Sequence, residues 1–420
     1  MAFDLSLSPI KNSKNEYLKS QIFGKKEIAE FTGYHNLFKF PIGTTKDGKI
    51  YCIDLSEACR ILMLGLTRSG KTWLLRVFLD RLYKTGLFKL FIATDIKDEF
   101  KSSYRRLQNK FKHLLLKGEK PCGIPIVTIR PTFFSTLQGK FKFLKEDNIW
   151  YSPNINDMSK ADFLTLMRAD ELTENQRISM NIIYDKILER GGLRDVDEFD
   201  MIIDEIEDIT PDQRRAMKYK FYLIKKDNFF NKKYNLDVVD MLAQNFVVAN
   251  NLEGFEEYGT DGAPYPAVNV NILQNIVNKA QRTKMFGNNM RLFNIIDEAS
   301  RFIPSDRNLC TVRTYSESVD IDARYGIYYL FATQTYDKLP EGIIKQCRYV
   351  FLPYSADLET IRRVLRDTGI LEVSAYQANR MISIKKQMKK HEWIVVDRNK
   401  REFSIVKPLA PLSHHMETGE

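Results

Sequence analysis

A phosphate-binding loop limits the folds that are open to this chain. The segment Gly65-Leu-Thr-Arg-Ser-Gly70-Lys71-Thr72 contains the complete pattern GxxxxGK[ST]. A strand-like run, residues 60–64, precedes it and is apolar from Ile61 onward, and apolar residues recur at helical spacing from Trp73 to Tyr83. A strand without a polar side is typical of a parallel sheet that helices cover on both faces. The order of strand, glycine loop and helix therefore predicts an α/β fold with a site for nucleotide phosphates.

The residues of this loop have separate chemical roles. Gly65 and Gly70 let backbone N–H groups curl around the β-phosphate, and Lys71 reaches the β and γ oxygens. The hydroxyl group of Thr72 is expected to bind Mg²⁺. The residues that we expect to bind the nucleotide are Gly65, Thr67, Arg68, Ser69, Gly70, Lys71, Thr72 and Trp73.

A nucleotide hydrolase also needs a metal-binding carboxylate and a group that activates water. Two apolar runs end in Asp-Glu, at Asp204-Glu205 and at Asp297-Glu298. The first lies in an acidic stretch whose isoleucines recur at helical spacing, which indicates an exposed helix. The second follows a turn, so we predict Asp297 as a Mg²⁺ ligand and Glu298 as the general base. The next apolar run ends in Gln334, which we expect to hydrogen-bond the γ-phosphate.

Strands and helices alternate along the chain except in one helical block. Apolar, strand-like runs lie at residues 87–93, 124–129, 245–249, 291–298, 325–334 and 348–352, and Arg130-Pro131 is expected to end the second of these. Between about 150 and 235 the pattern is helical, with capping boxes predicted at residues 159–162 and 173–176. We therefore predict a mostly parallel, doubly wound sheet with an all-helical insertion. The predicted parts are a short N-terminal segment (1–40), a first core part (41–149), the insertion (150–235) and a second core part (236–420).

The amino-acid composition excludes several classes of protein. Charged residues make up 28% and hydrophobic residues 44% of the 420 residues, and no apolar run approaches the ~18 residues that cross a bilayer. We expect no membrane insertion, and the amino terminus lacks the features of a secretory signal. Five cysteines without a CxxC pair favour reduced thiols in a cytoplasmic protein and argue against zinc. The net charge of +10 is compatible with nucleic-acid binding.

Basic residues concentrate in three segments that we consider as phosphate contacts: 101–120, 214–233 and 385–390. Aromatic residues of the second segment either stack on bases or pack in a helix core; they are Tyr219, Phe221, Tyr222, Phe229 and Phe230. Acidic residues concentrate around 195–208. We therefore expect the basic segments to carry more uncompensated charge than the net value indicates.

The order of these motifs resembles the HerA/FtsK superfamily of hexameric P-loop ATPases that translocate DNA, and most of all its archaeal HerA-type branch. The resemblance runs from about Pro41 to the carboxyl end. Asp95 and Glu99 match the family's D-x-x-G-E-[YF] segment, with Asp98 in the place of the usual glycine. The other matching segments are Thr173–Gln176, Asp297–Ala299, Arg324–Ile327, Ala332–Gln334 and Pro408–His414.

The resemblance implies a RecA-like fold, and a homo-hexameric ring that hydrolyses ATP with Mg²⁺ between subunits and moves double-stranded DNA. An arginine of one subunit then enters the site of the next, and Arg324 and Arg348 are both candidates because each precedes an apolar strand. Asp95 and Glu99 are candidate accessory residues. A nuclease or a capsid or channel protein is the kind of partner implied. Family members begin with a β-barrel domain, for which residues 1–40 are too short.

Related motors remain as alternatives, namely a viral genome-packaging ATPase and a conjugation or secretion ATPase. A P-loop ATPase that remodels protein assemblies is the alternative without DNA. A GTPase would need Asn-Lys-x-Asp, and the sequences after Asn231 and Asn278 lack its aspartate. An ABC-type subunit would need Leu-Ser-Gly-Gly, which the sequence does not contain. A small-molecule kinase would have no use for the pair of Glu298 and Gln334.

Overall fold

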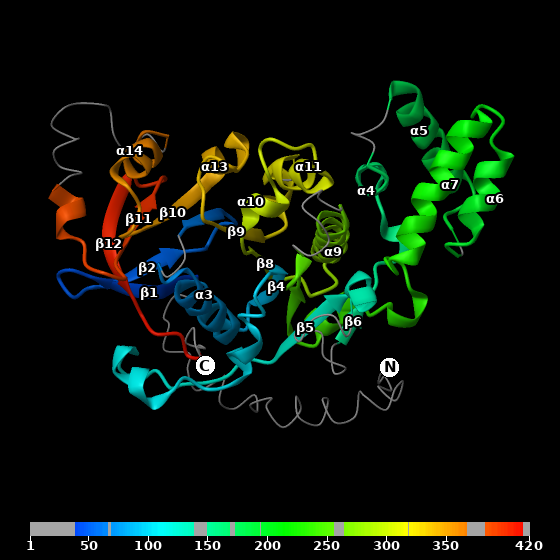
Figure 1. The fold of residues 1–420 in the computed structure, drawn as a ribbon. Coiled ribbons are helices and arrows are strands. Elements are labelled where there is room, and N and C mark those ends of the chain that lie inside the picture. Colours follow the sequence, from blue (N-terminus) through cyan, green and yellow to red (C-terminus); the bar gives the residue numbers. More distant parts are fainter. Residues whose placement is uncertain are drawn as a thin grey trace.

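A twelve-stranded sheet runs through the computed structural model of the chain, in the order β2-β1-β12-β11-β10-β3-β9-β8-β4-β7-β5-β6 (Figure 1). The structure describes residues 38–65, 69–137, 149–168, 173–193, 195–255, 264–317, 319–367 and 383–414. The strands are β1 Lys39–Thr45, β2 Ile50–Asp54, β3 Arg60–Leu64, β4 Phe88–Asp95, β5 Ile126–Pro131, β6 Ile149–Tyr151, β7 Val247–Asn251, β8 Arg291–Ile296, β9 Ile327–Thr333, β10 Cys347–Pro353, β11 Trp393–Asp397 and β12 Glu402–Pro408.

Helices lie between most of the strands. The α-helices are α3 Lys71–Thr85, α4 Lys160–Leu166, α5 Glu174–Glu189, α6 Glu198–Glu205, α7 Pro211–Lys226, α8 Val238–Ala243, α9 Tyr265–Arg282, α10 Ala299–Phe302, α11 Cys310–Glu317, α12 Val319–Arg324, α13 Glu341–Gln346 and α14 Leu358–Asp367. Short 3₁₀ helices are η1 Lys101–Tyr104, η2 Asn109–Leu114, η3 Thr132–Leu137, η4 Ile155–Asp157 and η6 Lys232–Tyr234. None of the helices in the described ranges combines the length and the hydropathy that crossing a bilayer requires.

The sheet is parallel from β10 through β3, β9, β8, β4, β7 and β5 to β6, as the pairing of these strands shows. Both faces of this part are buried. Ile61 and Met63 of β3 belong to one apolar cluster together with α3, whereas Leu62 and Leu64 belong to the cluster on the other face. Because side chains alternate along a strand, helices cover both faces. The predicted α/β class with a mostly parallel, doubly wound sheet is confirmed.

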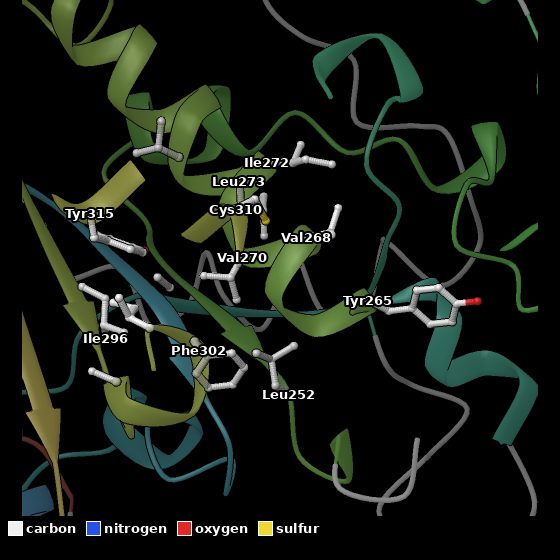
Figure 2. Close-up of a cluster of buried hydrophobic side chains, with 14 of the residues drawn as sticks. Leu252, Tyr265, Val268, Val270, Ile272, Leu273, Ile296, Phe302, Cys310 and Tyr315 are labelled. Atoms are coloured by element: carbon white, nitrogen blue, oxygen red, sulfur yellow. The ribbon is translucent and has the colours of Figure 1, made fainter. Parts of the chain in front are cut away.

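Helix α9 supplies much of the second cluster. Figure 2 shows Val268, Val270 and Leu273 of this helix in the same cluster of buried side chains as Ile296, the last residue of β8. Phe302 of α10 lies in the same cluster and is 2% exposed. This packing fixes the end of β8 and the turn after it, where the predicted Asp-Glu pair is located.

The other end of the sheet is antiparallel, and this arrangement of its strands was not predicted. Strand β11 pairs with β10 and β12, β12 pairs with β1, and β1 pairs with β2, all antiparallel. The residues that follow β12 then pass along α3. The indole N–H of Trp73 donates to the carbonyl of Leu409 at 2.8 Å. The buried carboxylate of Asp80 accepts the backbone N–H groups of Leu412 and Ser413 at 2.6 and 2.8 Å. The C-terminal segment therefore satisfies polar groups of the helix that begins at Lys71.

The stretch between β6 and β7 contains helices only, within the part of it that the structure describes. Both predicted capping boxes in it are present, at Ser159 before α4 and at Thr173 before α5. One detail of the neighbouring β5 was wrong, because Arg130 and Pro131 belong to the strand instead of ending it. Pairing with β7 stops at Ile129, so Pro131 needs no N–H group on that side. The domain boundaries stay a prediction, since residues 1–37 lie outside the described ranges.

Candidate nucleotide-binding site

The predicted site residues of the loop and of the two neighbouring strands gather at one edge of the sheet. Strands β3, β9, β8 and β4 are adjacent in this order, and each continues into a segment that we singled out in the sequence. Gly65 follows β3, Gln334 follows β9 and Asp297 follows β8, while Asp95 is the last residue of β4. In open α/β sheets, ligands bind outside the carboxyl ends of the strands. The topology therefore brings these residues to the edge where a nucleotide is expected.

Two glycines shape the described part of the loop. A Cβ atom on Gly65 would lie 2.6 Å from Oγ of Ser69 and 3.2 Å from Cβ of Lys71, so a larger residue there would require the loop's side chains to shift. Gly70 precedes α3 with φ of 89°, a left-handed conformation that glycine adopts without strain. The hydroxyl group of Ser69 is buried and has no hydrogen-bond partner among the described residues. Thr67 and Arg68 lie outside the described ranges.

The side chain of Lys71 contacts both members of the Asp-Glu pair. Its Nζ atom lies 2.8 Å from Oδ1 of Asp297 and also hydrogen-bonds Oε1 of Glu298. All three residues are buried, with exposed fractions of 9%, 3% and 3%. Burial disfavours the charge of the lysine, but the two carboxylates outweigh this and raise the pKa of Lys71 above its ordinary value. The ammonium group is therefore fixed as a cation at the edge of the sheet.

Gln334 joins the same group of side chains. Its Nε2 atom donates a hydrogen bond of 2.8 Å to Oε1 of Glu298. Glu298 itself has φ of 50° and ψ of 44°, a left-handed conformation that costs a non-glycine residue energy and often marks a functional site. The hydroxyl group of Thr94 donates to the backbone carbonyl of Asp297 at 2.6 Å and thereby ties the turn to β4. One oxygen of the Glu298 carboxylate thus accepts hydrogen bonds from both Lys71 and Gln334.

A second set of contacts surrounds Thr72. Its hydroxyl group donates a short hydrogen bond to the carboxylate of Glu99. The backbone N–H of Glu99 donates to Oδ1 of Asp95 at 3.0 Å, and the guanidinium group of Arg76 donates to the carbonyl of Glu99. Asp98, which occupies the position of the family's glycine, has φ of 52°, where glycine is unstrained. The accessory residues Asp95 and Glu99 are therefore connected to the loop through Thr72.

The environment of the Asp95 carboxyl group leads us to expect that the stability of the fold depends on pH. Burial, aided by the nearby Asp98, raises the pKa of Asp95 from 3.8 to about 8. Between these values the folded protein holds a proton that the unfolded chain has lost, so the free energy of unfolding falls as pH rises. We expect the difference in unfolding free energy between the Asp95→Asn variant and the wild type to grow in favour of the variant from about pH 4 to pH 8. Urea unfolding at several pH values measures it, and a difference independent of pH would contradict the assignment.

Trp73 and the two candidate arginines lie apart from these contacts. The indole of Trp73 packs on Phe111, at 5.2 Å between ring centroids, and on the C-terminal segment. Arg324 ends α12, just before β9, and Arg348 lies near the start of β10. Both are thus at the amino ends of parallel strands, on the edge opposite the loop. Arg324 is exposed, whereas Nε of Arg348 lies 3.7 Å from Oδ1 of Asp397, and its side chain is 13% exposed.

Three neighbours of the site were missed by sequence reasoning. Thr94 precedes the recognised Asp95, and Arg76 lies one helical turn after Thr72, so their positions gave a signal that was not used. Trp393 of β11 lies against the loop, with its indole 3.3 Å from the position of a Cβ atom on Gly65. No motif connects Trp393 to the loop, because it comes from the antiparallel strands.

The Asp204-Glu205 pair lies in α6, as the helical spacing predicts. Its carboxylates pair with basic side chains, Asp204 with Lys218 at 2.6 Å and Glu205 with Arg190. The pair lies outside the loop's group of contacts and belongs to the surface of the helical block.

The same contacts correct our expectation about charge. The acidic stretch lies against the second basic segment and neutralises part of it: Lys218 pairs with Asp204, Lys225 with Asp197 and Lys232 with Asp195. Of the two roles left open for the aromatic residues of this segment, core packing holds for Phe221, Phe229 and Phe230, which are buried. Tyr219 and Tyr222 remain exposed, at 62% and 57%.

The chain was compared with known proteins. Among solved structures, the chain is similar to VirB4 of Thermoanaerobacter pseudethanolicus, with a TM-score of 0.59 and 12% identity over 90% of this chain and 98% of that one. It is also similar to the genome packaging NTPase B204 from Sulfolobus turreted icosahedral virus 2 in complex with AMPPCP (TM-score 0.35, 12% identity, 85% and 100% covered). A third is the bacterial conjugative coupling protein TrwB (TM-score 0.48, 12% identity, 85% and 88% covered).

No protein with a curated function matches the sequence. Residues 40–284 match the family described as the central domain of the helicase HerA, which is more than half of the chain. The match includes the phosphate-binding loop and Asp95, while the Asp-Glu pair and Gln334 follow it in the sequence. The chain therefore belongs to the family of the HerA central domain and has a RecA-like P-loop ATPase fold.

Proposed function

We propose that this protein is an ATPase that moves double-stranded DNA and hydrolyses ATP between the subunits of a homo-hexameric ring. The observation that carries the ATPase part is the group formed by Lys71, Asp297, Glu298 and Gln334, in which the side chains of three separate segments meet at the carboxyl ends of β3, β8 and β9. A cation for phosphate, a metal-binding carboxylate, a base and an amide are the parts that hydrolysis of a nucleotide requires.

The loop and its helix would bind the substrate. Lys71 is a fixed cation and suits the β- and γ-phosphate oxygens of ATP. The unpartnered hydroxyl of Ser69 and the N–H groups at the start of α3 are further donors to these oxygens. Thr72 and Asp297 supply the hydroxyl and the carboxylate that would hold Mg²⁺, and these oxygen donors fit that ion. When bound, Mg²⁺ neutralises charge on the phosphate groups.

Glu298 would take the proton from the attacking water. Its carboxylate already accepts hydrogen bonds from Lys71 and Gln334, so its direction is set before a substrate arrives. Gln334 also follows β9 directly. It can therefore hydrogen-bond the γ-phosphate and transmit the loss of that group to the segment after the strand.

The exposed basic segments would contact DNA. Arg105, Arg106, Lys110, Lys112 and Lys117 are all exposed in residues 101–120, and Lys386, Lys389 and Lys390 are exposed near the C-terminal strands. Such contacts to phosphates carry no sequence preference and suit a motor that moves along any DNA. A homo-hexamer would repeat each segment around its channel.

The decisive experiment measures phosphate release by the full chain with and without double-stranded DNA, with Glu298→Gln as the inactive control. We expect duplex DNA to raise the rate several-fold. We also expect the affinity for duplex to fall steeply between ~50 and 200 mM salt, because phosphate contacts release counterions. ATP hydrolysis that DNA does not change would contradict the translocase and favour the ATPase that remodels protein assemblies.

Genome packaging and conjugation or secretion are the alternative tasks for the same motor. They differ in the partner that receives the DNA, a capsid or a membrane channel, and not in the chemistry at Lys71 and Glu298. A stable complex with a capsid portal or channel protein in a pull-down with purified components would favour one of them, and a complex with a nuclease would favour DNA processing.

A further inference from the structure

Helix α7 carries a stripe of two tyrosines and two cations on its outer face, and we call these four residues the α7 stripe: Arg215, Tyr219, Tyr222 and Lys226. All four side chains are exposed, and they recur at spacings of four, three and four residues. At about 100° per residue, such positions lie within about 60° of one another around the helix. They therefore form one continuous surface along α7.

The rest of α7 is already occupied. Met217, Phe221 and Ile224 are buried on the side opposite the stripe. Lys218 and Lys225 lie on the flank that faces α6, where they pair with Asp204 and Asp197. In contrast, the cations of the stripe form no ion pair or hydrogen bond with any residue in the described ranges. The acidic stretch thus neutralises the flank of the helix and leaves the charge of the stripe available.

The composition of the stripe favours nucleic acid over protein. Tyr219 and Tyr222 are two of the three exposed large aromatic residues in the described part of the chain, and they are neighbours on one helix face. Exposed aromatic rings flanked by cations are the pattern of surfaces that stack unpaired bases and follow the phosphate backbone. Tyrosine and arginine are also common at protein interfaces, but the centre of such an interface is apolar and contains few lysines. The stripe contains no aliphatic residue, and both of its charges are positive.

We propose that the α7 stripe binds single-stranded nucleic acid, with bases stacked on Tyr219 and Tyr222 and phosphates bound by Arg215 and Lys226. The two cations are eleven positions apart, about 16 Å along the helix, which is enough for a few nucleotides at roughly 3.4 Å each. The helical block lies beyond β6, away from α3 (Figure 1), so this surface is separate from the ATP site. The inference rests on the nucleic-acid part of the proposed function and not on ATP hydrolysis.

The role of the two tyrosine rings is tested by measuring the binding of a fluorescent oligothymidylate to the full-length protein. Binding is followed by fluorescence anisotropy in the absence of ATP. We expect the double variant Tyr219→Ala/Tyr222→Ala to bind at least about tenfold more weakly, since stacking contributes about 1–3 kcal/mol per base. The matched variant Tyr219→Phe/Tyr222→Phe keeps the rings and is expected to bind like the wild type. Equal affinity of the alanine variant and the wild type would overturn the proposal, as would equal losses in both variants.

The cations are tested with two variants of identical net charge. Arg215→Ala/Lys226→Ala removes the cations of the stripe, and Lys218→Ala/Lys225→Ala removes two acid-paired cations of the same helix. We expect only the first to reduce the salt dependence of oligonucleotide binding, by about 1.4 in the slope of log K against log[salt], because each single-strand phosphate contact contributes about 0.7. Equal slopes in the two variants would mean that the salt dependence follows the net charge of the protein and not the position of the cations, and would overturn the proposal.

The outcomes distinguish a failure of this inference from a failure of the proposed ATPase function. All substituted side chains are on the surface, so we expect each variant to keep the melting temperature of the wild type, and this is checked by circular dichroism. Loss of oligonucleotide binding in the alanine variant supports the stripe even if duplex DNA fails to stimulate ATP hydrolysis. Conversely, the Glu298→Gln variant is expected to bind the oligonucleotide as the wild type does, and a loss of binding in that variant would contradict a binding surface separate from the ATP site.

Discussion

The Glu298→Gln variant is expected to bind ATP and to hydrolyse it about 10²–10⁴ times more slowly than the wild type, which is the usual contribution of a general base. The substitution keeps the size of the side chain and an oxygen that can accept the hydrogen bonds now donated by Lys71 and Gln334. It removes the carboxylate that would take the proton of the attacking water. The loss should therefore appear in kcat, while the affinity for a non-hydrolysable ATP analogue stays within a few-fold.

Steady-state phosphate release and equilibrium binding of the analogue measure the two quantities separately. Glu99→Gln is the matched control, because Glu99 is the other glutamate near the loop and hydrogen-bonds Thr72 and not Lys71. We expect this control to lose much less activity. If Glu298→Gln retains most of the turnover and Glu99→Gln loses it, then Glu99 is the base, and our assignment of roles at this edge is wrong.

The parallel half of the fold was predictable because its signals are local. Strand β3 has the predicted bounds, residues 60–64, since a continuous apolar run bounded by a glycine loop has few alternatives. The proximity of Lys71 and Asp297 could also be predicted from the sequence. Parallel strands that alternate with helices end on the same edge, so motifs that follow such strands come together even when hundreds of residues separate them.

The antiparallel arrangement of the other edge was not predicted, and in one of its strands the local signals conflict. Strand β1 contains Pro41 and Gly43, residues that usually mark turns. In the structure these two residues form an irregularity in the pairing with β2. A Cβ atom on Gly43 would lie 2.5 Å from the carbonyl oxygen of Lys407, so the glycine permits the close approach of β12. Tertiary pairing, which a single sequence does not reveal, overrides the local preference.

The distribution of charge was mispredicted for a similar reason. Counting charges along the sequence separates the acidic stretch from the basic segment, although Asp204 pairs with Lys218 and Asp195 with Lys232 in the fold. These partners are 14 and 37 positions apart, and only the packing of α6, α7 and η6 brings them together. A cluster of charges in sequence is therefore not evidence for a charged surface until its neighbours are known.

Replacing Arg324, a candidate for an arginine that acts between subunits, gives the second large expected effect. We expect Arg324→Ala to lower ATP turnover by roughly 10³–10⁵-fold, the contribution of an arginine finger, while ATP still binds. The structure favours Arg324 over Arg348, because Arg324 is exposed at the end of α12 and Arg348 is held by Asp397 and by the ring of Tyr349. An arginine that reaches a neighbouring subunit must be free to leave its own.

The position of Arg324 is also well supported from within its own subunit. Asp322, two residues earlier in α12, is buried and accepts hydrogen bonds from Arg282 of α9 and from the hydroxyl group of Tyr329, each at 2.5 Å. These contacts hold α12 against α9 and β9. The position of α12 is therefore fixed, and with it the position of Arg324. A residue that must enter the ATP site of a neighbouring subunit requires such fixed placement.

Mixed rings test whether Arg324 acts on a neighbouring subunit. The Arg324→Ala variant keeps an intact ATP site but lacks the arginine, whereas Glu298→Gln keeps the arginine but lacks the base. Each alone should be inactive, and a mixture should regain activity wherever a Glu298→Gln subunit donates its Arg324 to the site of an Arg324→Ala subunit. Arg313→Ala, which removes an exposed arginine paired with Glu317, is the control and should leave turnover unchanged. A mixture that stays inactive would place the arginine's action within its own subunit. Wild-type turnover in both Arg324→Ala and Arg348→Ala would rule out hydrolysis between subunits through either residue.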